Sequence, residues 1–179
     1  MVTSGTPVEI TPEEMNKKIR NGKLADGVYK IDVSNMMAEG TIAWVERTYK
    51  DGVVNGVEKT YINGKLFAEG NYINGKPNGV LTGYYESGKL NSETSTKDGK
   101  TDGISKQYYK NGNLKSIEEN KLGKSKYIKW YSENGLLRGE MFFDESGKPN
   151  SKKEYDDGGN LIRKLNQDEI FKEIKNKTN

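Results

Sequence analysis

Between residues 49 and 165 the chain alternates short stretches of strand-forming residues with glycine-centred turns. The stretches at 66–72, 80–85 and 104–109 are rich in tyrosine, threonine, valine and isoleucine, which favour a pleated β surface. Apolar and polar positions alternate imperfectly along them, and each stretch has the length of one strand. The pattern predicts about ten or eleven antiparallel strands joined as an up-and-down meander.

Glycines mark the turns with a regular period, which is typical of a repeat protein. Two interleaved ladders of glycines recur in steps of 23 or 24 residues. Because only the glycine is constant, and because Ser87 and Leu122 would resist a positive φ, we expect type I turns closed by one left-handed glycine, not type I′ turns. The turn glycines are Gly52, Gly64, Gly75, Gly88, Gly99, Gly112, Gly123, Gly135, Gly147 and Gly159.

The predicted strands give the sheet two unequal faces, since successive side chains point to opposite sides. Neither face holds enough leucine and valine for a two-layer sandwich. We therefore expect a mainly β fold, a single-layer twisted antiparallel meander of β-hairpin repeats with a period of about 24 residues. One face would carry Leu66, Ala68, Gly70, Leu81 and Gly83, and the opposite face Phe67, Glu69, Tyr84, Glu93, Tyr108 and Lys115.

Two short helices are predicted, one on each side of the repeats. Thr11 to Glu14 form a capping box with proline at the first helical position, and 166–169 has a similar spacing. The predicted organisation is an N-terminal helix and capping segment at 1–40, the repeat array at 41–165 and a C-terminal capping helix at 166–179. We expect the helices to cover the open ends of the sheet. The alternative is that the last helix docks a partner.

The absence of two residue types excludes most catalytic chemistry. The 179 residues include no cysteine and no histidine, which excludes thiolate nucleophiles, histidine-based triads and the usual zinc ligands. The Gly-Lys steps at Gly99 and Gly123 lack the earlier glycine of a phosphate-binding loop. Adjacent carboxylates such as Glu118 and Glu119 would point to opposite faces of a strand. We expect no enzyme, no cofactor and no metal; a carboxylate-based hydrolase is the least favoured alternative.

Charge and hydropathy narrow the range of partners and compartments. The net charge of +3 is spread evenly along the chain, so we expect no nucleic-acid partner. Apolar runs are too short for a transmembrane segment, and the first ten residues lack the apolar run of a signal peptide. The absence of cysteine favours an extracytoplasmic location, in the envelope or secreted, over a cytoplasmic one.

Aromatic residues recur with the repeats and are the candidate binding residues. A structural interpretation is that cross-strand aromatic pairs hold a thin sheet together. A functional interpretation is that one exposed ladder of rings binds a protein partner, because tyrosine and tryptophan are common interface anchors. Both can hold, one on each face. The candidates are Tyr61, Tyr84, Tyr85, Tyr108, Tyr109, Trp130, Tyr131, Phe142 and Tyr155.

Residues 61–79 carry a nearly complete repeat unit through Tyr61, Gly64, Lys65, Leu66, Glu69, Tyr72, Gly75, Lys76 and Gly79. This unit resembles the bacterial MORN-variant repeats (MORN-2 type; membrane occupation and recognition nexus). The resemblance covers about 49–165 and is less regular after Gly123. It implies a hairpin array without catalytic residues, in a family whose members include antitoxins, immunity-type partners of secreted toxins and envelope proteins.

The resemblance and the residue patterns together lead to two hypotheses of function. The first is a non-catalytic scaffold that binds a protein partner through one face of the sheet, in an antitoxin- or immunity-like role. The second is an envelope-associated module that binds glycan or lipid headgroups through peripheral membrane or cell-wall contact.

Overall fold

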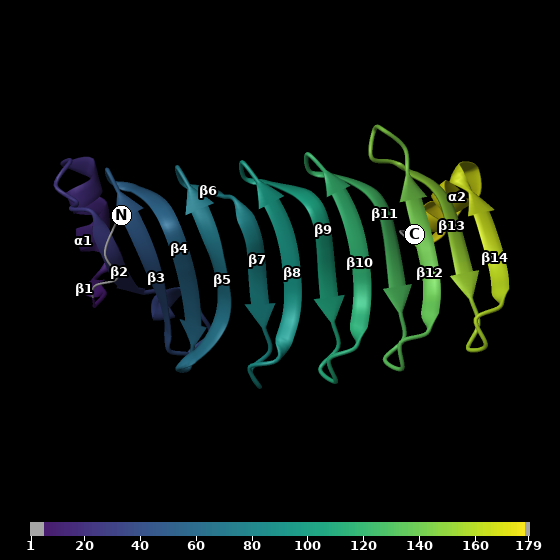
Figure 1. The fold of residues 1–179 in the computed structure, drawn as a ribbon, viewed down its shortest axis with the longest axis horizontal. Helices are drawn as coiled ribbons and strands as arrows, with labels where there is room; N and C mark the ends of the chain where they lie inside the picture. The colour runs from purple at the N-terminus through teal and green to yellow at the C-terminus, as the bar shows by residue number, and fades with distance from the viewer. Residues whose placement is uncertain (1–5, 178–179) are drawn as a thin grey trace. The chain divides into compact units, whose positions relative to one another are not determined.

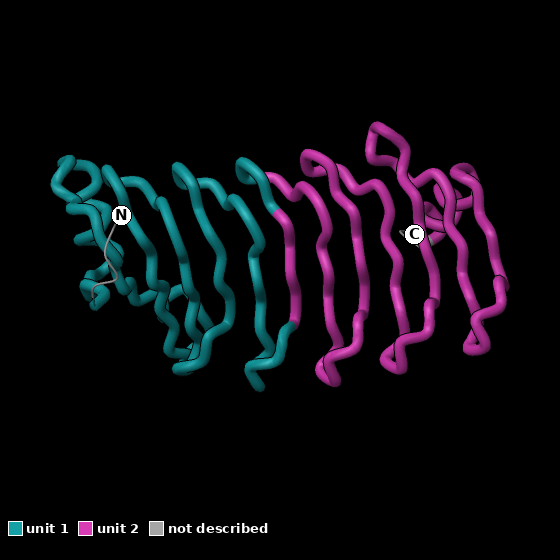
Figure 2. The backbone as a smooth tube through the Cα atoms, in the orientation of Figure 1, with its two compact units in different colours: residues 1–90, 96–99 teal, residues 91–95, 100–179 magenta. Residues whose placement is uncertain are grey.

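The computed structural model describes residues 6–177 and shows a mainly β chain of fourteen strands and two α-helices (Figure 1). The chain divides into two compact units, residues 1–90 with 96–99 and residues 91–95 with 100–179 (Figure 2). Strand β8 (Leu90–Lys97) contributes residues to both units. The predicted fold class, a mainly β array of antiparallel hairpins with short helices near its two ends, is confirmed.

In the first unit the strands are hydrogen-bonded in the order β1-β2-β3-β4-β5-β7, and β6 also pairs with β5. The pair of β1 and β2 is parallel, whereas the neighbouring pairs after it are antiparallel. The sheet thus extends into the segment at 1–40, where the sequence pattern predicted only a helix. The elements are β1 (Val8–Ile10), α1 (Pro12–Arg20), β2 (Gly27–Asp32), a 3-10 helix (Ser34–Met36), β3 (Ala43–Lys50), β4 (Val53–Ile62), β5 (Lys65–Ile73), β6 (Lys76–Pro77) and β7 (Gly79–Tyr84).

In the second unit the strands follow one another in chain order from β9 to β14, and each pair is antiparallel. Helix α2 (Gln167–Lys177) follows the last strand directly. The strands are β9 (Lys100–Tyr108), β10 (Leu114–Lys121), β11 (Lys124–Tyr131), β12 (Leu137–Phe143), β13 (Pro149–Tyr155) and β14 (Leu161–Asn166).

The turns are of two kinds, and the prediction of a single kind is wrong for half of them. Gly88, Gly112, Gly135, Gly147 and Gly159 are each the one left-handed residue of a longer connection, as predicted. The two-residue connections at Gly52, Gly64, Gly75, Gly99 and Gly123 instead have a positive φ at both residues, including φ 51° at Leu122. A two-residue loop must be a primed turn to match the twist of its strands. Loop length therefore overrides the preference of Leu122.

Apolar side chains are buried at the two helical ends of the chain. Ile10, Met15, Leu24, Tyr29, Ile31 and Tyr49 form one cluster around α1 and the first strands. Leu165 and Ile170 are buried where α2 begins. Between residues 51 and 164 no apolar side chain is buried, which agrees with the single-layer sheet expected from the low content of leucine and valine.

Both predicted helix caps are present. Thr11 Oγ1 accepts a hydrogen bond from the Glu14 amide, and the Thr11 amide donates to the Glu14 carboxylate. Asn166 and Glu169 form the equivalent pair at α2. Helix α2 lies behind β13 and β14 (Figure 1), where Glu173 contacts Lys152 of β13 at 3.8 Å and also Arg163 of β14. The helix therefore covers a face of the final hairpin instead of the outer edge of β14.

Candidate binding surface

Within each unit, one face of the sheet carries a row of glutamates and lysines that are cross-strand neighbours. We call this the Glu–Lys row and its face the Glu–Lys face. Opposite charges directly across a strand pair attract, so the row stabilises the register. In the first unit it runs Glu9, Lys30, Glu46, Lys59, Glu69 and Thr82, and in the second Lys106, Ile117, Lys129, Glu140, Lys153 and Lys164.

Glu140 is the most enclosed member of the row, with 7% of its surface exposed. Its carboxylate accepts hydrogen bonds from Lys153 at 2.9 Å and from the Tyr155 hydroxyl at 3.0 Å. Lys129 lies 3.6 Å away on the other side. The bond from Lys153, supported by that from Tyr155, lowers the pKa of Glu140 below its ordinary value. The carboxylate is therefore ionised and held in place at neutral pH.

Tyrosine hydroxyls reach glutamates at a constant spacing of 15 residues, and two of these glutamates belong to the row. Tyr84 donates to Glu69 at 2.6 Å, and Tyr155 to Glu140 at 3.0 Å. Tyr108 makes the same bond to Glu93 at 2.7 Å. The glutamate-to-tyrosine spacing is visible in the sequence, and it is the signal that could have paired these residues in advance.

These tyrosines are poor candidates for catalysis. Burial, together with the hydrogen bond to Glu93, raises the pKa of Tyr108 to about 12. Burial first, and then the nearby glutamates, also raise the pKa of Tyr61 and Tyr155. The phenols are therefore neutral at physiological pH, and they lack the lowered pKa that a base or nucleophile needs. Their arrangement suits recognition.

The structure divides the predicted aromatic ladder between the two faces. Tyr84, Tyr108 and Tyr155 lie on the Glu–Lys face through their bonds to its glutamates. Phe142 lies there as well, with its ring 6.3 Å from that of Tyr127 and near Lys153. Trp130 lies on the opposite face, against Gly139.

The remaining ladder residues make contacts at strand ends. The Tyr109 hydroxyl donates to the backbone carbonyl of Tyr131 at 2.7 Å, which joins two successive hairpins. Tyr85 lines a small pocket of about 220 Å³ with Leu66 and Phe67. These contacts fit the structural interpretation of the ladder.

Trp44 belongs to the Glu–Lys face, although the tyrosine-glycine motif gave no sign of it. Its ring stacks on Tyr61 with centroids 5.1 Å apart, and the Lys30 ammonium lies 5.0 Å from the Trp44 ring centroid. Glu9 and Asp32 complete the wall of a pocket of about 420 Å³ beside this ring. The position of Trp44 two residues before Glu46 is the signal that would have placed it on this face.

Aliphatic side chains on the Glu–Lys face are more exposed than most of the aromatic candidates. All of the candidates are half-buried except Phe142, which is 36% exposed. Val57 and Val80 of the first unit are 49% and 51% exposed. Each stands two residues from a member of the row, at Lys59 and Thr82, so each shares its face. Phe67 is the extra residue at the register shift between β4 and β5, so strand alternation does not place it on this face.

The opposite face is built from small residues covered by large neighbours. A Cβ on Gly70 would lie 2.2 Å from Leu81 Cδ2, and one on Gly139 would lie 2.0 Å from Trp130 Cζ2. In the second unit this face also has a polar groove of about 250 Å³. Its lining includes Ser92, Thr94, Ser105, Gln107, Ser116, Glu118 and Asn120.

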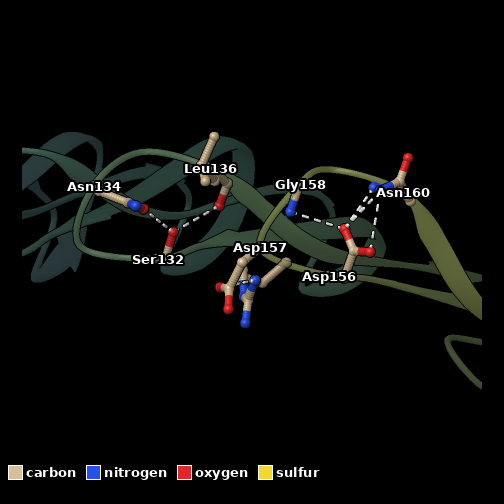
Figure 3. Close-up of polar contacts among 8 residues, drawn as sticks. Ser132, Asn134, Leu136, Asp156, Asp157, Gly158 and Asn160 are labelled. Atoms are coloured by element: carbon tan, nitrogen blue, oxygen red, sulfur yellow. Dashed lines mark hydrogen bonds and ion pairs between the residues drawn. The ribbon is translucent and has the colours of Figure 1, made fainter.

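Side-chain bonds stabilise the longer turns of the second unit (Figure 3). Asp156 accepts hydrogen bonds from the Gly158 amide at 2.9 Å and the Asn160 amide at 2.8 Å. Ser132 bonds to Asn134 and to the Leu136 carbonyl in the turn before it. Arg138 of β12 pairs with Asp157 at 2.6 Å. These bonds anchor the turns to the sheet.

A comparison with protein families matches two of the repeats. The model of the MORN repeat variant matches residues 77–98 and 101–119, and MORN repeats are non-enzymatic modules. No curated protein matches the chain. A solved structure of a GtfA/B complex bound to UDP and GlcNAc is similar over 54% of this chain and 24% of its own, at 13% identity and a TM-score of 0.31. The described helices are too short or too polar to cross a membrane.

Proposed function

We propose that this chain is a non-catalytic repeat scaffold that binds a protein partner through its Glu–Lys face, in an antitoxin- or immunity-like role. The observation that carries the proposal is the exposure of Val57 and Val80 beside a row of fixed charges. Exposed apolar side chains of one unit that share a face are a common mark of a protein interface.

The composition of this face supports protein recognition. Trp44 and Tyr84 supply aromatic anchors of the kind that dominate binding energy in protein complexes. Lys59 and Glu69 are held in register by the strand pair and lie 4.0 Å apart. A partner would meet charges that are already ordered, which lowers the entropy cost of binding. Fixed charges also favour one partner over others through complementarity.

The two matched repeats support the same class of function, because MORN repeats generally mediate binding. The immunity-like role is the narrower part of the proposal. It requires the partner to be a secreted toxin, and a toxin encoded by the neighbouring reading frame is the first to test.

Affinity capture with matched face variants tests the proposal. Val57→Gln alters the Glu–Lys face of β4, whereas Thr60→Gln alters the opposite face of the same strand. We expect the unmodified chain and Thr60→Gln to retain one stoichiometric protein from native extract, and Val57→Gln to lose it. Circular dichroism should show that both variants fold. Full retention by folded Val57→Gln would contradict the use of this face.

The polar groove of the second unit favours a second candidate function, glycan binding in the envelope. Hydroxyl and amide side chains such as Ser92, Ser105 and Gln107 line it, and Trp130 pairs with the groove residue Ser116. Sedimentation with purified cell-wall material should then depend on Gln107. Gln107→Ala should reduce retention and Glu133→Ala in a turn should not. Equal sedimentation with lipid vesicles alone would indicate headgroup binding instead.

A further inference from the structure

Strand β14 is the outermost strand of the second unit. It pairs with β13 on one side, and no strand within residues 6–177 lies along its other side. Its residues 161–164 are all exposed. Alternate residues of such an edge direct backbone N–H and C=O groups to solvent, where another strand can pair with them. Helix α2 packs on the face of this hairpin and leaves the edge open.

The last residue of the Glu–Lys row, at this edge, has the same charge as the residue opposite it. Lys164 stands directly opposite Lys153. Its place, 24 residues after Glu140, is taken by glutamate at Glu69, Glu93 and Glu140 of the earlier repeats and by isoleucine at Ile117. Lys153 bonds to Glu140 on its other side, whereas Lys164 has no ion-pair partner among the described residues. Like charges in direct opposition destabilise a strand pair, so a carboxylate next to Lys164 would relieve the repulsion.

The same edge carries unpartnered apolar surface. Leu161 is 51% exposed and stands opposite Tyr155, so it shares the Glu–Lys face with Lys164. Ile162, the extra residue at the register shift, is 64% exposed. A strand added at this edge would therefore meet an apolar side chain and a cation on one face.

We infer that the edge of β14 accepts an extended, acidic segment of a partner protein as an added antiparallel strand. The segment places a carboxylate beside Lys164 and an apolar side chain beside Leu161, and its backbone bonds to the open edge. A second copy fits poorly, because 161–166 contains Arg163 and Lys164 and no acidic residue. The cations exclude basic strands and other copies while they attract an acidic one. This surface is separate from the exposed apolar patch of the first unit.

Fluorescence anisotropy with a short labelled threonine-rich peptide, in which a valine and a glutamate stand two residues apart and so share a face, tests the inference on the full chain. We expect saturable binding that weakens about tenfold in Lys164→Glu, because an attraction becomes a repulsion. Lys97→Glu, an exposed lysine of another strand, should bind as the unmodified chain does. A peptide with lysine in place of glutamate should not bind. Hydrogen exchange should slow at the amides of 161–166 when the acidic peptide is present.

Several results would overturn the inference. Absence of saturable binding would do so, as would equal losses in Lys164→Glu and Lys97→Glu, or exchange protection elsewhere than 161–166. A concentration-dependent increase in mass that Lys164→Glu abolishes would show that a second copy occupies the edge. Because Val57→Gln leaves β14 unchanged, it should bind the acidic peptide normally. Binding at the β14 edge and binding through the Glu–Lys face can therefore be refuted independently.

Discussion

The N-terminal region at 8–50 and the hairpin repeats at 51–164 are both β-sheet, yet they are stabilised differently. In the first, Ile10, Met15, Tyr29 and Ile31 belong to an apolar cluster beneath α1. In the repeats the buried side chains belong to Thr96, Asn120 and Glu140. The helix-capped region has a small globular core, whereas the repeats have none.

The difference shows how a single-layer sheet remains stable and still presents both faces to partners. Each repeat is held by backbone bonds, turn geometry and side-chain pairs to its neighbours, which is the usual condition of repeat proteins. Apolar burial is confined to the ends, where the helices lie. Between the two ends, both faces of the sheet keep half-exposed side chains, which a hydrophobic core would have buried.

The largest effect should come from the apolar cluster. Met15 is 3% exposed, and Met15→Ala should destabilise the fold by about 3 kcal/mol through lost burial and a cavity. Urea unfolding followed by circular dichroism measures this change. Ile19→Ala, on the same helix but 37% exposed, is the control and should cost much less. Equal losses would show that the cluster does not carry the stability of this region.

The next effect should come from close packing across the repeats. Gly139→Ala would force a methyl group into the Trp130 ring, and we expect a loss of about 2 kcal/mol. Because the φ of Gly139 is not positive, the loss would be purely steric. A double-mutant cycle with Trp130→Leu checks this cause, since the smaller side chain should remove most of the penalty. A penalty unchanged in the double variant would contradict it.

The charged row should give a pH-dependent effect. Folding lowers the pKa of Glu140 below its ordinary value of 4.5, so the stabilisation is fully present above that pH and is lost as pH falls through the lowered pKa. Glu140→Gln should therefore cost about 1.5 kcal/mol at pH 7 and little in strong acid. Urea unfolding across this pH range measures the difference. Glu145→Gln, an exposed turn residue, should show no such dependence.

The smallest effect should be a gain. Leu122 has φ 51° in a two-residue turn and is 61% exposed, so its side chain gains little from the conformation it is forced to adopt. Leu122→Asn should raise the free energy of unfolding by about 1 kcal/mol, because asparagine tolerates this region better. Leu136→Asn, in a turn where φ is not positive, should give no gain. A loss at Leu122 would indicate an unrecognised contact of its side chain.

Periodicity was sufficient to predict the repeats, and the capping motifs were sufficient to predict the two helix starts. The glycine ladders located the turns of the repeats, and Ala68, Gly70, Leu81 and Gly83 were assigned to the correct face because strand alternation is local. Leu66 was assigned to the wrong face, because the register shift between β4 and β5 places it opposite Tyr61 on the Glu–Lys face. Turn type was missed at Leu122, because the number of connecting residues decides it and the strand ends were not known. Strands β1 and β2 were missed, because a parallel pair between segments separated by a helix leaves no local pattern.

The candidate site was predicted only in outline. The tyrosines were identified from their repeats, but their bonds to Glu69, Glu93 and Glu140 depend on register between strands. Trp44 lies outside the motif, and the exposure of Val57 and Val80 follows from the absence of a second layer. These features require the whole sheet and cannot be derived from one segment.

Cysteine footprinting tests the central claim, binding through the Glu–Lys face, most directly. The chain has no cysteine, so a single introduced cysteine is the only thiol in it that can be alkylated. Val57→Cys and Val80→Cys place the probe on the Glu–Lys face of the first unit, and Thr60→Cys on its opposite face. The account predicts that the captured partner slows alkylation at Val57→Cys and Val80→Cys and leaves Thr60→Cys unchanged. Protection of Thr60→Cys alone, or equal protection of all three, would contradict it.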